Sequence, residues 1–487
     1  MKLLIKNTTL ITMNEEKEII QGSLLIGNGK IKDIIPTSSG SEFDFTAGEV
    51  MDGSEMIVLP GMTNAHYHSY SNLLKGTISN LPLEIWSLYT VAYGHSLDDQ
   101  DIELAVLLGA IDMIKSGITS CVDHFPHIRR TEAALKAYEK TGMKIGFAPM
   151  MHDVFDHHFL PVSLPLNIKE KLEAVKPNSP KVMRNYYTNL IKNWHQKNGK
   201  ISIFLGPNAP QRCSDEMLNL CEELSKQEGL FIHTHLLETE IQKRVGDRTF
   251  TDGIIGRLKK YKLLSSKLST AHSVWLNDRE IDLFAEHGVT VVCNPVSNLM
   301  LGSGIAPLPQ YWRAGVYVAL RTDSSNCGIS HNLFEAMRMA LLIHRVGNNC
   351  YEQWIQPWNV LQMSINGGAH VFGEAHKRGK IQKGYDADLV LLKKDTPTFA
   401  TNSDLISQLV FYENGISVDS VLINGEWVLK NKRIMTFDEK SVIRRVQERY
   451  QAIMEKCQPA LELAKEAHPY FARMYHKIHD QIKEAIQ

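Results

Sequence analysis

The sequence of 487 residues predicts an α/β protein: a (β/α)8 barrel of the TIM type, a small β-sandwich built from both chain ends, and a helical C-terminal tail. Three observations lead to this prediction. The middle of the chain alternates helix-like and strand-like runs, both flanks contain short strand-like runs with hairpin turns, and the end of the chain has helical periodicity. The expected boundaries are 1–58 with 380–437 for the sandwich, 59–379 for the barrel and 438–487 for the tail.

The two flanks of the chain resemble each other in pattern. Residues 3–12 and 22–36 contain apolar and β-branched runs, with Asn28-Gly29 at a hairpin tip. Residues 383–395 and 418–434 repeat the pattern, with Asn424-Gly425 at the turn. Neither flank can bury a sheet face alone, so we expect both to form one β module.

In the middle of the chain, an amphipathic helix repeatedly ends at Gly and is followed by an apolar strand, which is typical of parallel β/α sheets. Roughly eight such strands can be counted, the number that closes a barrel. An open, doubly wound sheet is the alternative, but no GxGxxG follows an early strand. The clearest helix and strand pairs are 98–117 with 118–125, 131–142 with 143–151, 214–229 with 230–238, 277–288 with 289–295, and 308–315 with 316–323.

Two segments depart from this alternation of helices and strands, one within it and one after it. Residues 152–200 are expected to form a long insertion after a barrel strand, where insertions usually shape a substrate pocket. The tail has helical periodicity, which we expect to be broken at Pro459 and Pro469. Its apolar positions are expected to cover the barrel or a dimer partner.

Composition excludes several classes of function. Hydrophobic residues make up 43% and charged residues 22%, and the formal net charge of −1 gives no reason to expect nucleic acid or an anionic membrane as partner. No apolar run approaches the ~18 residues of a membrane span, and the N-terminus lacks the apolar core of a signal peptide. The cysteines are odd in number and never form CxxC, so we expect a reduced, cytoplasmic protein. They are Cys121, Cys213, Cys221, Cys293, Cys327, Cys350 and Cys457.

The first motif with chemical meaning is an HxH pair, His66 and His68, at the end of an apolar run. Strand residues two apart point to the same side, so both imidazoles are expected at the barrel mouth. Neutral imidazole binds Zn²⁺ and similar ions well. By itself, HxH also fits two ordinary histidines.

A second motif, FIHTHLLET, places His233 and His235 on another strand, with Glu238 just beyond. Spacing alone does not choose between the two histidines as a metal ligand. His272 and Asp323 also fall at predicted strand ends. Together these residues predict a catalytic centre with three imidazoles and a carboxylate around one divalent ion, which would lower the pKa of its bound water to about 7.

With these motifs in place, the chain resembles the amidohydrolase superfamily, in particular its cytosine-deaminase-like branch. That branch includes guanine deaminase, methylthioadenosine/adenosylhomocysteine deaminases, and triazine chlorohydrolases and aminohydrolases. The resemblance covers nearly the whole chain. It rests on PGMTNAHYH, HLLET, AHSVWL, residues 294–308, the Thr-Asp pair at 322–323, and KGYDADLVLL at 383–392.

The resemblance implies a distorted (β/α)8 barrel and one divalent metal, Zn first and Fe second. It implies a catalytic role for Glu238 as the proton shuttle to the ring nitrogen and leaving group, for His272 in holding the attacking water or tetrahedral oxygen, and for Asp323 in taking the proton of the water. His233 then becomes a core-facing strand residue. The implied metal ligands are His66, His68, His235 and Asp323.

Three features depart from the relatives. The position two before the aspartate is usually Gly, and here it is Arg321, which should point into the barrel. A buried guanidinium needs a partner, so we expect it to pair with an acidic side chain or to contact substrate, unless it is purely structural. Cys327-Gly328 replaces the usual Ser-Asn, and the resemblance assigns no counterpart to the insertion 152–200.

The expected activity is hydrolytic deamination of an aminated nitrogen heterocycle, such as a purine, pterin, pyrimidine or triazine. The alternatives are a hydrolase that removes a halide or alkylamine from such a ring, and a non-catalytic binding protein on the same fold. A nucleic-acid deaminase is disfavoured, because its His/Cys zinc signature is missing. His124, Trp86 and Arg321 are expected to contact the substrate. Trp275 is a further aromatic ring that could stack on a flat heterocycle. By analogy with relatives, we expect a homo-oligomer, a dimer or higher.

Overall fold

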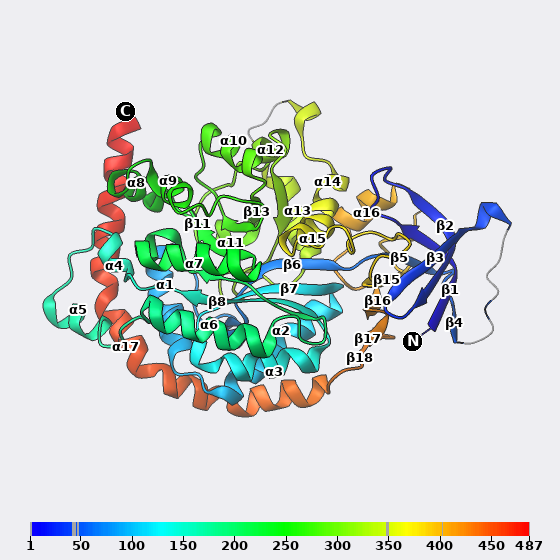
Figure 1. Ribbon diagram of the computed structural model, residues 1–487, viewed down its shortest axis with the longest axis horizontal. Helices are drawn as coiled ribbons and strands as arrows, with labels where there is room; N and C mark the ends of the chain where they lie inside the picture. Colours follow the sequence, from blue (N-terminus) through cyan, green and yellow to red (C-terminus); the bar gives the residue numbers. More distant parts are fainter. Residues whose placement is uncertain (1, 41–44, 46–47, 347–349, 402, 487) are drawn as a thin grey trace.

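The computed structural model describes residues 2–40, 45, 48–346, 350–401 and 403–486. Its centre is a barrel of parallel strands surrounded by helices (Figure 1). Two hydrogen-bonded groups of strands make up the wall, and an isolated parallel bridge between Leu205 and Ile232 joins them. The strands are β6 (Met62–Tyr67), β7 (Ile118–Phe125), β8 (Lys144–Met151), β9 (Ile201–Ile203) with β10 (Gly206–Pro207) at one position, β11 (Ile232–Leu236), β12 (Leu268–His272), β13 (Thr290–Cys293) and β14 (Tyr317–Leu320).

The barrel closes between β14 and β6 without a regular ladder. The Asp323 N–H donates to the His66 carbonyl at 3.3 Å. The side chain of Asn64 replaces the other ladder bonds: its Nδ2 donates to Thr322 Oγ1 at 2.8 Å, and its Oδ1 accepts from the Thr322 N–H at 3.0 Å. The distortion of the barrel therefore lies beside the predicted site.

Helices cover the outside of the barrel, and the barrel strands are therefore buried at almost every position. All five helices predicted from the Gly-terminated pattern are present, within two residues of the expected bounds: α2 (Asp99–Lys115), α3 (Thr131–Thr141), α7 (Asp215–Glu228), α10 (Asp278–His287) and α12 (Leu308–Arg313). The pattern did not predict α1 (Leu83–His95), α8 (Glu240–Thr249), α9 (Gly253–Lys260), α11 (Pro295–Met300), α13 (Leu333–Ile343), α14 (Pro357–Gln362), α15 (Gly368–Val371) and α16 (Leu405–Phe411).

The two segments that flank the barrel in the sequence meet in one sheet at its side (Figure 1). In this nine-stranded sheet, β5 pairs with β1 from the N-terminal flank and with β15 from the C-terminal flank, and the sheet has a hydrophobic core of its own. The three-unit division with its boundaries stays a prediction. The strands are β1 (Lys2–Ile11), β2 (Ile19–Gly27), β3 (Lys30–Pro36), β4 (Glu49–Asp52), β5 (Met56–Pro60), β15 (Leu389–Lys393), β16 (Val418–Ile423), β17 (Glu426–Lys430) and β18 (Arg433–Ile434).

The segment 152–200 differs in part from the expected insertion. Its first half contains two short helices, α4 (Asp156–Phe159) and α5 (Leu166–Leu172), which are not part of the alternating strands and helices of the barrel. Its second half is α6 (Pro180–Trp194), a barrel helix that packs beside β9 and α7. A single apolar face, with Met183, Tyr187, Leu190 and Trp194 buried, accounts for this packing.

The tail is one continuous helix, α17 (Glu439–Ile486), so the expected breaks at Pro459 and Pro469 are wrong. Each proline removes one backbone donor and costs roughly 3 kcal/mol in a helix interior. Burial of a long apolar face against α1 and α2 offsets this cost, and the helix bends around the barrel (Figure 1). That face contains Ile453, Cys457, Leu461, Ala464, Ala467 and Phe471.

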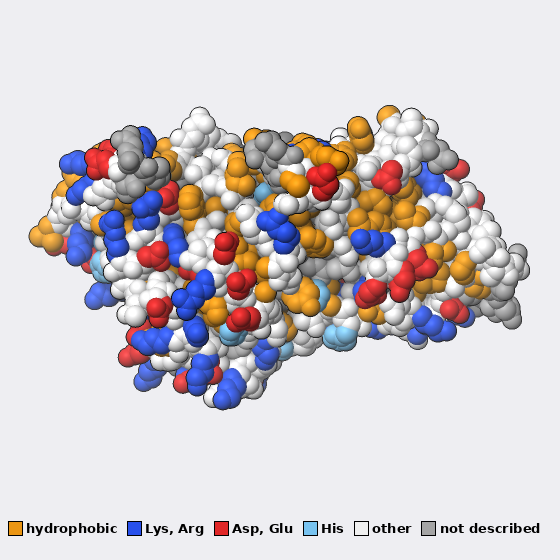
Figure 2. Space-filling model, turned by 90° about the horizontal axis from the view of Figure 1, so that it is seen from above, with side chains coloured by type: hydrophobic (Ala, Val, Ile, Leu, Met, Phe, Trp, Pro, Cys, Tyr) orange, Lys and Arg blue, Asp and Glu red, His pale blue; other side chains and the backbone are white. Residues whose placement is uncertain are grey.

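Acidic and basic side chains are interspersed over the face seen in Figure 2, in line with the balanced composition. Hydrophobic side chains lie between them as separate groups. In the part of the chain that the structure describes, no helix has the length and apolar character needed to cross a membrane.

Candidate metal centre and active site

Three imidazoles from two strands converge at the carboxyl ends of the barrel strands. His66 and His68 lie on or just after β6, and His235 lies on β11. His68 Nε2 is 3.1 Å from His66 Nε2 and 3.3 Å from His235 Nε2. The three ligand atoms all lie within 4.8 Å of one another. Around a tetrahedral zinc ion, donor atoms are separated by about 3.3 Å, so this spacing suits one ion.

The second nitrogen of each imidazole has a partner that orients the ring. His68 Nδ1 lies 2.6 Å from the His124 carbonyl, and His235 Nδ1 lies 2.8 Å from the Asn208 carbonyl. A carbonyl only accepts, so both Nδ1 atoms carry the proton. Each Nε2 then has a free lone pair directed at the shared point, as metal-ligating histidines require.

Asp323, just beyond β14, completes the group. Its Oδ1 lies 3.6 Å from His68 Nε2 and 3.8 Å from His66 Nε2. Its Oδ2 accepts hydrogen bonds from Asn294 Nδ2 at 2.7 Å and from Ser297 Oγ at 2.8 Å. These two bonds leave Oδ1 facing the imidazoles. The four predicted ligands therefore lie together, and their donor set fits a zinc-type ion.

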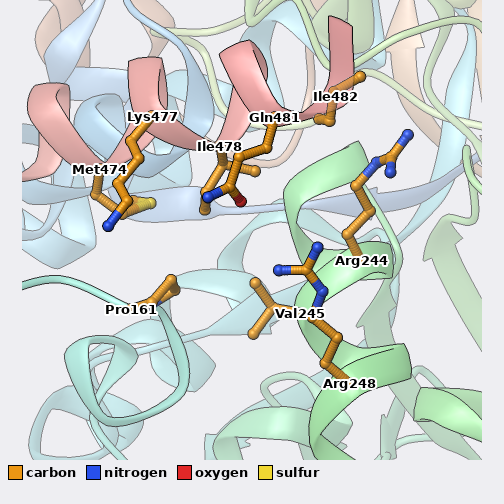
Figure 3. A pocket seen from close by; sticks show the side chains of 9 residues that line it. All are labelled: Pro161, Arg244, Val245, Arg248, Met474, Lys477, Ile478, Gln481 and Ile482. Carbon is orange, nitrogen blue, oxygen red and sulfur yellow. The ribbon is translucent and has the colours of Figure 1, made fainter. Parts of the chain in front are cut away.

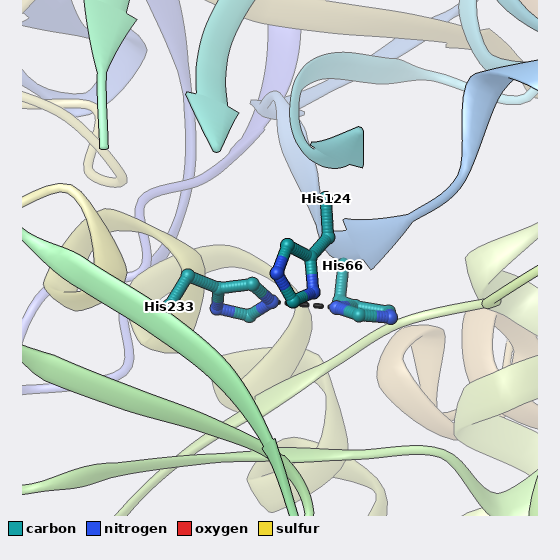
Figure 4. Close-up of side chains that lie close together, drawn as sticks. All are labelled: His66, His124 and His233. Atoms are coloured by element: carbon teal, nitrogen blue, oxygen red, sulfur yellow. Dashed lines mark hydrogen bonds between the residues drawn. The ribbon is translucent and has the colours of Figure 1, made fainter. Parts of the chain in front are cut away.

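His124 and His233 lie beside this group and form a second set with His66. Figure 4 shows their rings pointing toward one another inside the barrel, from β7, β11 and β6. His233 Nε2 lies 2.5 Å from His66 Nδ1, and its Nδ1 lies 2.7 Å from Ser269 Oγ. His233 is thus core-facing and orients His66, since His66 has its other nitrogen toward His68. His124 Nε2 lies 3.3 Å from the Gly206 carbonyl.

Glu238 and His272 face each other next to the predicted ligands. Glu238 Oε2 is 3.1 Å from His272 Nε2, and Ser303 Oγ donates to Glu238 Oε1 at 3.3 Å. His272 Nδ1 lies 2.8 Å from Asn298 Oδ1, which accepts its proton. The Nε2 of His272 therefore has a lone pair that can accept a hydrogen bond from the protonated carboxyl group of Glu238, which points to a neutral, hydrogen-bonded pair.

The electrostatics of the site agree with this protonation. Burial, with the charges of Asp323 and Glu84, raises the pKa of Glu238 well above its ordinary value. Burial lowers the pKa of His272. Burial also lowers the pKa of His235, and the neighbouring His68 and His272 lower it further. A protonated Glu238 beside neutral imidazoles is what proton delivery to a substrate requires.

Asp323 has the opposite shift. Burial acts to raise its pKa, but Arg321, followed by His272 and His68, outweighs burial and holds the pKa well below the usual range. Two carboxyl groups in one site thus take different charge states, Glu238 protonated and Asp323 ionised. Such a separation marks an acid and a base in many active sites.

Arg321 points into the barrel, as expected from its strand position, and is the largest fully buried side chain. Its Nη2 lies 3.6 Å from Asp323 Oδ2, an ion pair that is too long for a hydrogen bond. None of its three guanidinium nitrogens has a hydrogen-bond partner in the described structure. Burial lowers its pKa to about 9.

The backbone at the site is strained at two strand ends. His272 has φ of 70° and Asp323 has φ of 71°, in the left-handed region that favours Gly. Such a conformation costs on the order of 1 kcal/mol or more in a non-glycine residue, and it is concentrated at functional sites. Here it turns both side chains from the strand direction toward the barrel mouth.

A cavity of about 40 Å³ is lined in part by Trp275 and by Ser303, the residue whose hydroxyl group is hydrogen-bonded to Glu238. Trp275 Nε1 donates to the Ser303 carbonyl at 2.7 Å. Trp86 is buried and instead packs with Ile78, Leu301 and Cys327. The wall of the cavity also contains Glu84, Thr239, Tyr475 and His479, the last two from α17.

Sequence reasoning missed Glu84 and the α17 residues of this wall. Glu84 is buried, its Oε1 accepts from Thr239 Oγ1 at 2.6 Å, and its Oε2 has no hydrogen-bond partner in the described structure. Burial raises its pKa. No motif marks this position in the sequence, because Glu84 lies in the first turn of an otherwise ordinary helix. Asn294, Ser297 and Asn298 fell within a motif of the resemblance, but only the structure shows their contacts.

A larger cavity, of about 170 Å³, lies elsewhere and contains none of the predicted site residues. Figure 3 shows it between Pro161 of the insertion, Arg244, Val245 and Arg248 of α8, and side chains of α17. The insertion, α8 and α17 thus meet at one place outside the histidine cluster.

The fold and the site define a barrel hydrolase with a histidine-rich centre at the carboxyl ends of its strands. The chain belongs to the amidohydrolase family, whose model matches residues 57–428. This family is metal-dependent, and its curated relatives here are hydrolases acting on C–N bonds.

Two relatives are similar over nearly the full chain. The 5-methylthioadenosine/S-adenosylhomocysteine deaminase of Caldicellulosiruptor saccharolyticus is 29% identical, over 92% of this chain and 97% of the relative. The 5′-deoxyadenosine deaminase of Methanocaldococcus jannaschii is 31% identical, over 93% of this chain and 99% of the relative.

Solved structures confirm the fold. An adenosine deaminase from Xanthomonas campestris with bound zinc superposes with a TM-score of 0.84, at 22% identity, and covers 93% of this chain and 98% of its own. An atrazine chlorohydrolase from Arthrobacter aurescens complexed with zinc has a TM-score of 0.83 at 21% identity, and the match covers 92% of this chain and 100% of the chlorohydrolase chain. The predicted (β/α)8 barrel with a chain-end sheet and a C-terminal helix is confirmed.

Proposed function

We propose that this chain is a metal-dependent aminohydrolase that converts the adenine ring of a 5′-modified nucleoside to hypoxanthine. Water replaces the exocyclic amino group, which leaves as ammonia. The observation that carries the proposal is the Glu238–His272 pair, 3.1 Å apart, beside three converging imidazoles and an ionised Asp323. The similarity to two nucleoside deaminases over nearly the whole chain supports the choice of ring.

One divalent ion would be held by His66, His68, His235 and Asp323. Imidazole nitrogens with one carboxylate oxygen favour Zn²⁺, with Fe²⁺ as the second choice. When bound, such an ion polarises the substrate and makes water acidic enough to lose a proton near neutral pH.

The residues around this position would divide the proton transfers. Asp323 is ionised and can accept the proton of the attacking water. Glu238 holds a proton and can give it to the ring nitrogen next to the reacting carbon. His272, oriented by Asn298, can stabilise the oxygen that adds to the ring. A second proton, delivered through Glu238, allows ammonia to leave.

Glu84 is suited to recognising the sugar of such a substrate. Glu84 lines the cavity of about 40 Å³, and its buried Oε2 has no hydrogen-bond partner in the described structure, so a hydroxyl group that reached it could form a hydrogen bond. The cavity of about 40 Å³ is much smaller than a nucleoside, so its walls must separate to admit one. Leu301 to Ser303 and α17 form much of those walls.

The test is ammonia release from zinc-loaded or iron-loaded protein with 5′-deoxyadenosine, methylthioadenosine, S-adenosylhomocysteine, adenosine, guanine and aminated pterins and triazines. We expect release from 5′-modified adenosines and its loss in Glu238→Gln. Chloride or alkylamine release from a triazine, without ammonia from any nucleoside, would instead favour the alternative leaving group. Protein that binds metal but turns over none of these substrates would contradict the proposal.

A further inference from the structure

Two histidines and a glutamate come together in the first half of the insertion, away from the barrel histidines. His157 and His158 lie in α4, and Glu173 directly follows α5. His157 Nε2 and His158 Nε2 each lie 2.8 Å from the same oxygen, Glu173 Oε1. Glu173 follows His158 by 15 positions in the sequence, so all three side chains come from one short stretch of the insertion.

The three groups have the chemistry of a metal site. Imidazole nitrogen and carboxylate oxygen are the ligands that Zn²⁺ and similar ions prefer outside thiolate sites. Their ligand atoms lie within 4.8 Å of one another. Ligand atoms around a tetrahedral zinc ion are about 3.3 Å apart, so each nitrogen needs to move only about half an ångström from Glu173 Oε1. Hydrogen bonds from His157 and His158 hold the pKa of Glu173 below its usual range, so this ligand is ionised.

We propose that His157, His158 and Glu173 bind a second divalent transition-metal ion, of the zinc class, which joins the two ends of segment 157–173. The site is independent of the proposed catalytic centre and shares no residue with it.

The surroundings position the ligands and leave access for the ion. The His157 side chain is 6% exposed and stacks on Phe155, with ring centroids 5.3 Å apart at 24°. Its ring is therefore fixed before metal binds. His158 and Glu173 are 43% and 29% exposed, so water can supply the remaining ligands. Lys169 Nζ is 3.9 Å from Glu173 Oε1, and its 46% exposed side chain can turn into solvent when an ion replaces it.

An ion at this position would stabilise the contact between the insertion and α17. Between the ligands, Leu160 and Ile168 are buried in a hydrophobic cluster with Phe471 and Met474 of the tail helix. Lys171 pairs with Glu466 of α17 at 2.7 Å. Joining residues 157 and 173 closes a loop whose closure otherwise costs chain entropy, so the ion should hold this segment against α17.

The experiment counts metal ions in the full-length chain. Protein stripped by a chelator is reloaded with excess Zn²⁺, freed of loose metal by gel filtration and analysed by mass spectrometry of the metal. We expect two ions per wild-type chain, one in the double variant His157→Ala/Glu173→Gln, and one in His66→Ala/His235→Ala. The matched control is His376→Ala/Glu170→Gln, which changes an exposed histidine and an exposed glutamate and should keep two ions.

Limited proteolysis gives an independent readout. Zinc should slow cleavage of the segment around the exposed Leu166 in the wild type and in the control, but not in His157→Ala/Glu173→Gln. Circular dichroism of the metal-free variants verifies that they are folded. The proposal is overturned if the insertion variant binds as many zinc ions as the wild type, or if zinc protects both equally from proteolysis.

Discussion

Arg321 Nη2 lies 3.6 Å from Asp323 Oδ2, and this long ion pair compensates a guanidinium that is fully buried and has no hydrogen-bond partner among the described residues. The same carboxylate is a proposed metal ligand through its other oxygen. Asp323 therefore lies between the guanidinium of Arg321 and the position of the proposed divalent ion. The positive charge of Arg321 opposes metal binding, and it also keeps Asp323 ionised.

Arg321→Met should increase metal affinity. The substitution keeps roughly the volume of the side chain and removes a positive charge beside Asp323, without breaking any hydrogen bond in the described structure. We expect zinc to bind about tenfold more tightly, equivalent to about 1.4 kcal/mol, in competition with a chromophoric chelator. Arg321→Lys retains the charge and is the control.

Equal affinity in the two variants would show that the charge of Arg321 does not act on the metal centre. If Arg321→Gly also left stability and kinetics unchanged, the expected pairing or substrate contact of Arg321 would be lost.

Glu238→Gln should abolish turnover and leave metal binding intact. The amide keeps the size of the side chain but cannot transfer the proton that the raised pKa of Glu238 retains. We expect kcat to fall by about 10²–10⁴-fold, the usual contribution of a general acid–base group, with metal content unchanged. Glu228→Gln, on the exposed end of α7, is the matched control. A near-normal kcat in Glu238→Gln would remove this residue from the mechanism.

Glu84→Gln should reduce discrimination for the sugar. Glu84 lines the cavity wall with an Oε2 that has no hydrogen-bond partner in the described structure, and the amide replaces one of its two oxygens by an NH₂ group. We expect kcat/KM for 5′-deoxyadenosine to fall about tenfold or more, the effect of losing one good hydrogen bond. The analogue that lacks both ring hydroxyls should react equally with the variant and the wild type. An equal loss for both substrates would assign Glu84 a structural role.

The metal-free protein should lose stability as the pH rises above about 4.5, because burial raises the pKa of Glu238 in the folded state. Below the pKa of the unfolded chain, both states hold the proton and Glu238 contributes no difference. Above it, the unfolded chain releases the proton while the folded chain retains it. The free energy of unfolding then decreases by at most about 1.4 kcal/mol per pH unit for this group until the folded pKa is reached.

Urea denaturation of the metal-free wild type and Glu238→Gln, at about pH 5 and about pH 8, measures this effect. We expect the variant to gain stability relative to the wild type, with the larger gain at the higher pH. A gain that is the same at both pH values would mean that Glu238 is not held protonated by the fold.

The order of helices and strands, and the placement of chemistry at strand ends, could be predicted from the sequence. Each barrel helix has an apolar stripe and ends at a turn, and each strand is a short apolar run, so local periodicity reports them directly. His66, His68, His235, His272 and Asp323 follow such runs, and in a parallel barrel all strands end on one side. For this reason the sequence alone could bring five residues from four separated segments to one place.

Tertiary packing decided the orientation of the site histidines, the continuity of α17 and the contacts of Glu84 and His157, none of which local sequence patterns contain. The nitrogen that each imidazole presents depends on the carbonyl groups of residues such as His124 on β7 and Asn208 just after β10, which belong to other parts of the barrel. Burial of the apolar face of α17 outweighs the cost of Pro459, so the helix continues where sequence rules end it. Glu84 and the cluster at His157 arise from contacts between distant or irregular segments. Periodicity reports the environment of a residue within its own element, whereas hydrogen-bond partners, charge neighbours and pKa shifts come from other elements.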